Sequence, residues 1–177
     1  MTKSALKMSP SRVAHYFFQN CERFLRYSAT PSALRESHSV PRPMHKYNAM
    51  SQQMFNLGYA WEEAAIRLLP QELVSIAEGT CALSERRFSV EKSIQLFREL
   101  QPTNQDDIRY IYQASLRATD EFYQRFGIDS QIVAFSDCHP DLIEVSLNKS
   151  GQRVFRVIDV KRSERVKATH RIQILLY

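Results

Sequence analysis

Residues 140–161 read PDLIEVSLNKSGQRVFRVIDVK and contain the clearest structural pattern of the chain. Its two apolar runs are separated by Asn148-Lys-Ser-Gly151, a sequence typical of a tight turn between antiparallel strands. Asp141 begins the first run, and Asp159 lies near the end of the second. We therefore expect a β-hairpin that brings two carboxylates to the same edge of a sheet.

In the rest of the chain, the apolar periodicity predicts mainly helices before this hairpin, then further strands close to it and a helix after it. The predicted helices are 10–28, 47–69, 71–77, 90–100 and 163–177. The predicted strands are 108–116, 131–135, 142–147 and 154–160. Trp61 is expected to anchor the core. This order predicts an α/β (α+β) fold in which a small mixed sheet is flanked by helices.

The domain organisation follows from the same pattern. Residues 1–46 are expected to form an N-terminal helix and a mobile loop, because 30–46 is rich in proline and serine and has no periodicity. Residues 47–177 are expected to form one compact core. The apolar pattern of the last helix ends abruptly, without a stop signal. We therefore expect a truncated C-terminus and a longer natural protein.

Composition sets limits on the class of protein. The 177 residues carry a net charge of +5, which permits contact with nucleic-acid phosphates without requiring it. The three cysteines, Cys21, Cys81 and Cys138, form no CxxC pair, so no zinc-finger or thioredoxin motif is present. No apolar run approaches the roughly 18 residues that span a bilayer. We expect a cytoplasmic protein without a membrane partner.

The hairpin carboxylates indicate a chemistry. Paired carboxylates form an oxygen-rich site that suits Mg²⁺ or Mn²⁺. In Asp159-Val160-Lys161, residues i and i+2 point to one face of a strand, so Asp159 and Lys161 are expected side by side. Such a metal ion lowers the pKa of a bound water, and Lys161 can hold that water or stabilise developing charge. The alternative is a plain charge pair on an exposed strand.

Four segments, in this order, resemble the RecB-like branch of the PD-(D/E)XK nucleases, which includes the RecB and AddB nuclease domains and the RecB-like nucleases of CRISPR adaptation. They are Ser11 to Tyr27 with Tyr16 and Cys21, Gly58-Tyr-Ala-Trp-Glu62, the pair Pro140-Asp141-Leu-Ile and Ile-Asp159-Val-Lys161, and Gln173-Ile-Leu-Leu-Tyr177. The third and fourth are similar to the family's "G-x-x-D-L-[IL]" with "D-x-K" and to its "Q-x3-Y" motif. The resemblance implies a restriction-endonuclease-like PD-(D/E)XK core.

The resemblance also implies roles for the matched residues. Asp141, Asp159 and the carbonyl of Val160 would bind the metal, Glu62 would approach it from its helix, and Lys161 would act on the nucleophilic water. Gln173 and Tyr177 would contact the edge of the active site or the DNA backbone. Helix register decides between Glu62 and the adjacent Glu63. Cys21 matches the first cysteine of the family's iron–sulfur cluster, but the three later cysteines have no counterpart, so no cluster is expected within this chain.

A basic cluster surrounds the predicted site and suits a phosphate backbone or, alternatively, a solvated helix face. The predicted DNA-binding residues are Arg162, Arg165, Lys167, His170 and Arg171. A surface role for His170 is an equal alternative. The sequence has no Gly-x4-Gly-Lys-[Ser/Thr] loop, so a helicase would be a partner or another part of the polypeptide.

The leading hypothesis is a Mg²⁺- or Mn²⁺-dependent deoxyribonuclease that acts in DNA repair, recombination or defence against foreign DNA. Two alternatives stay open. One is a catalytically inactive PD-(D/E)XK-like module that binds DNA or a protein. The other is a metal-dependent hydrolase of nucleotides or RNA.

Overall fold

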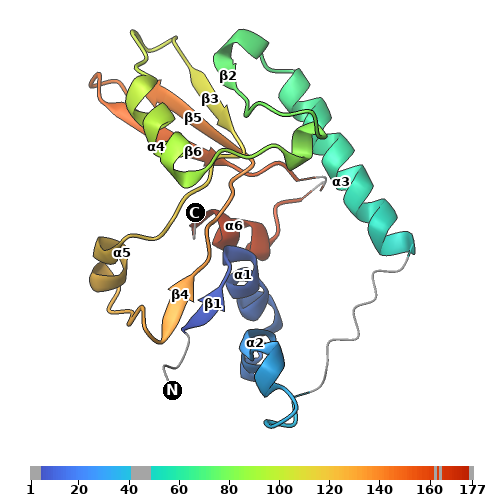
Figure 1. Ribbon diagram of the computed structural model, residues 1–177. Coiled ribbons are helices and arrows are strands. Elements are labelled where there is room, and N and C mark those ends of the chain that lie inside the picture. The colour runs from blue at the N-terminus through green and yellow to red at the C-terminus, as the bar shows by residue number, and fades with distance from the viewer. Residues whose placement is uncertain (1–4, 41–48, 162, 164, 176–177) are drawn as a thin grey trace. The chain divides into compact units, whose positions relative to one another are not determined.

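The computed structural model describes residues 5–40, 49–161, 163 and 165–175. It is a mixed α/β structure with a small mixed sheet, as the sequence predicted (Figure 1). The chain divides into two compact units. Unit 1 comprises 1–46, 117–138 and 166–176, and unit 2 comprises 47–116, 139–165 and 177. The grouping therefore assigns two later segments of the chain to the unit that contains the N-terminal part.

Unit 2 contains a four-stranded sheet in the order β2-β3-β5-β6. The strands are β2 (Val74–Ser75), β3 (Arg109–Tyr112), β5 (Leu142–Leu147) and β6 (Arg153–Ile158). β2 is parallel to β3, and the β3–β5 and β5–β6 pairs are antiparallel, so the sheet is mixed. β5 and β6 form the predicted hairpin, and its register pairs Leu142 with Ile158. Asp141 and Asp159 therefore lie just beyond the last pair of the ladder.

The hairpin turn is built by local side-chain chemistry. The Oδ1 atom of Asn148 accepts hydrogen bonds from the backbone N–H groups of Ser150 and Gln152, both at 2.9 Å. Gly151 has a φ of 74°, a left-handed conformation that glycine adopts without steric cost. The predicted turn residues thus fix the register that places the two aspartates.

One helix packs against one face of this sheet, and the last turn of another helix contacts the opposite face. On one face, Ile111, Ile143 and Val145 pack against apolar side chains of α4 (Val90–Glu99). On the other, Tyr112 and Leu142 pack against Ile66 of α3 (Ala49–Arg67). Successive strand residues point to opposite faces, which is why neighbours such as Ile111 and Tyr112 enter different cores.

The described residues also form short 3₁₀ turns in both units. They are η1 (Ser32–Leu34), η2 (Gln71–Leu73) and η3 (Leu83–Glu85). The predicted helix 71–77 is wrong beyond Leu73, because Val74 and Ser75 pair with β3 and complete the sheet edge. Within the described residues, no helix is long and apolar enough to cross a membrane.

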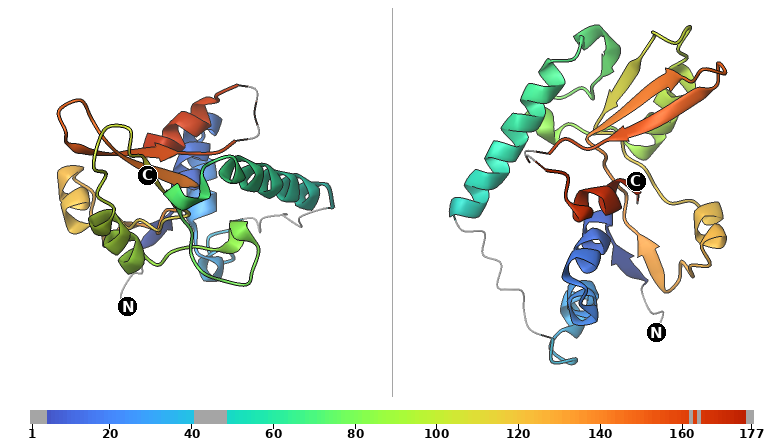
Figure 2. Two further views of the ribbon diagram at one scale, coloured as in Figure 1. Left: turned by 90° about the horizontal axis from the view of Figure 1, so that it is seen from above. Right: turned by 180° about the vertical axis from the view of Figure 1, so that it is seen from behind.

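Unit 1 combines helices with a two-stranded parallel sheet. Its elements are β1 (Leu6–Met8), α1 (Pro10–Gln19), α2 (Glu22–Ala29), α5 (Asp120–Arg125), β4 (Val133–Phe135) and α6 (Ala168–Leu175). β1 pairs with β4, and α1 packs against both α2 and α6, as the two views of Figure 2 also show.

Three predicted features differ in the structure. The helix predicted over 10–28 is two helices, because Asn20 adopts a left-handed conformation (φ 46°) and ends α1. The last helix begins at Ala168 rather than at 163. Trp61 is 51% exposed and is not a core anchor, because α3 turns Glu62 and Ile66 inward instead. Residues 41–48 of the predicted loop and of the start of the second helix lie outside the described residues.

Candidate functional site

The candidate site begins at the open end of the β5–β6 hairpin in unit 2. Asp141 immediately precedes β5, and Asp159 immediately follows β6. The backbone N–H of Val160 donates to Oδ2 of Asp141 at 2.7 Å. This bond crosses from one strand end to the other and fixes the Asp141 carboxylate beside the Asp159–Lys161 segment.

Asp159 is the most unusual of these side chains, because it is buried without a hydrogen-bond donor. Its side chain is 1% exposed, and neither carboxylate oxygen has a hydrogen-bond partner among the described residues. The Nζ atom of Lys161 lies 2.7 Å from Oδ1 of Asp159 and forms an ion pair with it. The predicted neighbours therefore lie together, although β6 ends one residue before Asp159.

A buried carboxylate with empty acceptor positions is costly for a protein unless a cation or a donor compensates for it. Lys161 supplies part of that compensation, and its side chain is 35% exposed, so the ammonium group also meets solvent. The unfilled acceptor positions of Asp159 fit a hard divalent cation, which prefers carboxylate oxygens.

Helix α3 contributes Glu62 to the same region. Glu62 is 8% exposed, and its Oε1 atom accepts hydrogen bonds from Tyr112 Oη and Gln113 Nε2, both at 2.7 Å. Glu63 instead forms an ion pair with Arg67 of the next turn, at 2.6 Å. The helix register thus selects Glu62, not Glu63, as the buried acidic residue of α3.

The charges of this region influence one another. The pKa of Asp141 is raised to about 7, mainly by burial and then by the negative charge of Glu62, with a smaller contribution from Asp159. The positive charge of Lys161 and the Val160 N–H act in the opposite direction. Burial, followed by the bond to Glu62, also raises the pKa of Tyr112, which keeps its hydroxyl a donor. Glu62, Asp141, Asp159 and Lys161 therefore form one electrostatic cluster, which we call the carboxylate cluster.

The carboxylate cluster is not a closed metal cage. No group of three or more His, Cys, Asp or Glu side chains within the described part of the chain is arranged to hold a metal ion. Asp141 and Asp159 are the pair that the hairpin brings together, and Glu62 is bonded to Tyr112 and Gln113 instead. Mg²⁺ sites commonly use one or two carboxylates and retain several waters, so a pair is chemically sufficient.

The other predicted site residues lie in several parts of the chain. Unit 1 contains Lys167, His170, Arg171 and Gln173. Unit 2 contains Arg165, which is exposed. The Nδ1 atom of His170 accepts a hydrogen bond from the Lys167 N–H at 3.3 Å, a bond at the start of α6. Arg162 and Tyr177 lie outside the described residues. Cys21 is a free, exposed cysteine.

Sequence reasoning missed Tyr112 and Gln113, the two residues that bind Glu62. Both lie in the segment 108–116, which the sequence predicts only as an apolar strand. Gln113 was the available signal, because a polar amide inside an apolar run that becomes buried requires a hydrogen-bond partner.

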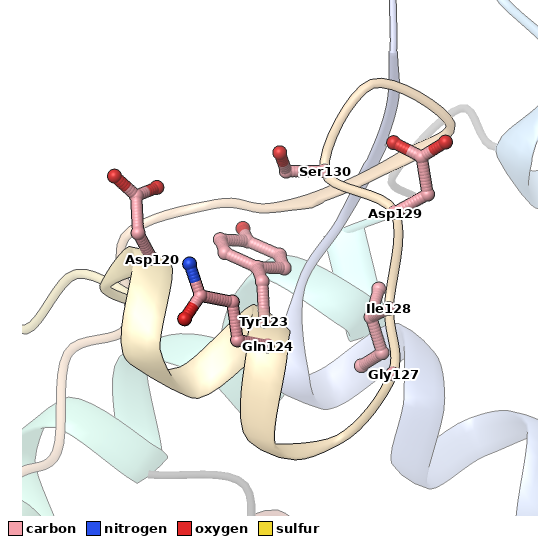
Figure 3. Close-up of a pocket in the computed structure, with 7 residues that line it drawn as sticks. All are labelled: Asp120, Tyr123, Gln124, Gly127, Ile128, Asp129 and Ser130. Carbon is pink, nitrogen blue, oxygen red and sulfur yellow. The ribbon is translucent and has the colours of Figure 1, made fainter.

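Two open hollows lie elsewhere. One, of about 330 Å³, lies in unit 1 between α5 and the loop that follows it (Figure 3). Two acidic residues, Asp120 and Asp129, line it, and Asp129 is engaged locally, since its Oδ1 atom accepts the N–H of Gln131. The other, of about 470 Å³, lies in unit 2 between α4 and the sheet and is largely apolar. Neither hollow contains a buried polar group without a partner among those described, which distinguishes both from the carboxylate cluster.

Comparisons of the chain with protein-family models, with curated proteins and with solved structures found no match.

Proposed function

We propose that this chain is a metal-dependent deoxyribonuclease with a RecB-like PD-(D/E)XK core. The observation that carries the proposal is the buried Asp159 carboxylate at the end of the hairpin, which pairs with Lys161 and accepts no hydrogen bond from the described residues. The order of the two aspartates and the lysine matches the motif on which the resemblance depends.

The residues present fit a Mg²⁺ or Mn²⁺ ion. The carboxylates of Asp141 and Asp159 and the carbonyl of Val160 would hold the ion, with Glu62 as a further ligand, either directly or through water. When bound, such an ion polarises a phosphate oxygen and lowers the pKa of a water molecule.

Lys161 supplies the positive charge that phosphodiester cleavage requires. Asp159 holds the Lys161 ammonium by an ion pair, while part of the lysine side chain remains exposed to solvent. In this position Lys161 orients the attacking water by hydrogen bonding or stabilises the negative charge that develops on the phosphate.

DNA is the proposed substrate because the resemblance implies it, and the basic character of the chain suits contact with phosphates. Arg165, Lys167 and Arg171 are exposed, as phosphate contacts must be, and the net charge is +5. The resemblance adds Gln173 and Tyr177 as contacts at the edge of the active site. DNA repair, recombination or defence, together with a helicase, is the proposed setting.

A catalytically inactive DNA- or protein-binding module is the second candidate. The observation that favours it is the absence, among the described residues, of a ready-made group of three metal-binding side chains. An inactive module would bind DNA equally well with or without Mg²⁺ and would cleave nothing.

Cleavage of linear and circular DNA, single- and double-stranded, tests the proposal. The wild-type protein should cut in Mg²⁺ or Mn²⁺ and not in EDTA, and Asp159→Ala and Lys161→Ala should abolish cutting. Glu62→Gln should lower the rate, whereas the matched control Glu63→Gln should leave it unchanged, because Glu63 only forms a surface pair with Arg67. A folded wild-type protein that binds DNA but never cleaves it would replace the proposal by the inactive module.

A further inference from the structure

Two consecutive residues donate to a single oxygen of Glu62. Tyr112 Oη and Gln113 Nε2 each lie 2.7 Å from Glu62 Oε1, and all three residues are buried. In a regular strand, consecutive side chains point to opposite faces, so only one of the two would reach this oxygen.

The backbone of Gln113 explains how both donors reach it. β3 ends at Tyr112, and Gln113 has a φ of 52°, in the left-handed region that residues other than glycine seldom adopt. This conformation breaks the alternation of the strand, so the amide of Gln113 reaches the face to which Tyr112 already points. Strained conformations of this kind persist where the surroundings hold them, and they gather at functional sites.

Both the N–H and the carbonyl group of the Gln113 backbone form hydrogen bonds. Its N–H donates to the carbonyl of Asp141 at 3.0 Å, and its carbonyl accepts the N–H of Phe88 at 3.2 Å. One residue therefore contacts Glu62 through its side chain and Asp141 through its main chain. A carboxylate is an acceptor only, so the NH₂ group of the Gln113 amide must face Glu62.

We propose that Gln113 is a positioning residue, which fixes the Glu62 carboxylate through Oε1 and leaves its second oxygen for the cation side of the carboxylate cluster. This inference rests on the proposed function, since it assigns to Glu62 a role in holding the metal. Partners that orient a ligand in this way commonly contribute an order of magnitude or more to metal affinity.

The test compares Mn²⁺ binding to purified full-length variants, measured by calorimetry and by the electron paramagnetic resonance of free Mn²⁺. Gln113→Met keeps the volume and removes the amide, and Gln113→Gly removes the amide while relieving the left-handed strain. Both should raise the Kd for Mn²⁺ by about tenfold. The matched control is Gln71→Met, because the Gln71 amide bonds only to backbone carbonyls at the end of α3, and it should bind Mn²⁺ like the wild type.

The Glu62→Gln variant distinguishes an effect of Gln113 that acts through Glu62 from an effect that does not. In Glu62→Gln protein, adding Gln113→Met should cause no further loss of Mn²⁺ affinity. A further tenfold loss there, or wild-type affinity in both single variants, would overturn the inference.

A readout without metal keeps this inference separate from the proposed function. The side-chain carboxyl ¹³C resonance of Glu62, assigned by its loss in Glu62→Gln, should move in Gln113→Met and stay in place in Gln71→Met. An unmoved resonance refutes the positioning role even if the enzyme is active. A moved resonance in a protein that never binds Mn²⁺ supports the contact and refutes the metal-dependent function.

Discussion

Replacing Asp141 by asparagine should stabilise the metal-free protein above neutral pH while it removes the metal site. Asparagine has the same shape, and its side-chain oxygen can still accept the N–H of Val160, which lies 2.7 Å from Oδ2 in the wild type. The substitution therefore removes the buried charge and keeps the bond. A gain in stability from the loss of a proposed functional residue is the signature of a site that the fold maintains at a cost.

The size of the effect follows from the raised pKa. The pKa of Asp141 moves from its ordinary 3.8 to about 7, chiefly because burial disfavours the charged form. A group whose pKa is raised in the folded state binds its proton more tightly there than in the unfolded state. The contribution of Asp141 to the free energy of unfolding is therefore greatest at low pH and falls as pH rises from about 4 to about 7. About three pH units at about 1.4 kcal/mol each set an upper value of about 4 kcal/mol, and coupling to Glu62 and Asp159 will share it.

Urea unfolding in EDTA at pH 5, 6, 7 and 8 measures this difference. Asp141→Asn should be more stable than the wild type at pH 8 by several kcal/mol, and the gap should narrow steadily toward pH 5. Asp107→Asn is the control, and it should change the free energy of unfolding in the opposite direction. The reason is that a backbone hydrogen bond from Thr103 holds the pKa of Asp107 below its usual value. A variant no more stable than the wild type at pH 8, or a gap that does not change with pH, would refute the buried-charge account.

Three further results are expected. Mn²⁺ at a hundred times its Kd should stabilise the wild type by about 2.7 kcal/mol in thermal melting and should leave Asp159→Ala unaffected, so an equal shift in both would place the metal elsewhere. Gly151→Ala should cost about 1 kcal/mol in urea unfolding because its φ is 74°, and an unchanged midpoint would contradict that strain. Ser93→Ala should cost about 1–3 kcal/mol in the same assay, because buried Ser93 Oγ accepts the N–H of Ser115 and donates to the carbonyl of Ser89; a neutral variant would show that the bonds are replaced.

The hairpin was predictable because its determinants are local. A glycine that fits a left-handed turn position and an asparagine that bonds its own backbone fix the connection between the strands. The two apolar runs on either side of this turn then form the paired strands. Once the register is known, the positions of Asp141 and Asp159 follow, and their chemistry follows from their type.

The environment of Glu62 was not predictable, because it depends on contacts between distant residues. Tyr112 and Gln113 lie 50 and 51 positions from Glu62 in the sequence. The left-handed backbone at Gln113 has no local signature, since glutamine is not a residue that prefers this conformation. The strand β2 was missed for a similar reason, because only its pairing with β3 distinguishes Val74 and Ser75 from the turn before them.

The distribution of hydrogen-bond donors over the three carboxylates is itself an argument for a cation. In the part of the chain that the structure describes, Glu62 accepts from two side chains, Asp141 accepts from one backbone N–H, and Asp159 accepts from none. A carboxylate that served only the core would be matched by donors or replaced by an apolar residue, because an unmatched one is costly. The unmatched oxygens instead belong to the most buried aspartate, beside a second aspartate and a partly exposed lysine. This arrangement lowers the stability of the metal-free fold, and a bound divalent cation would offset that loss. The Asp141→Asn and Mn²⁺ experiments together measure these two opposite effects on stability.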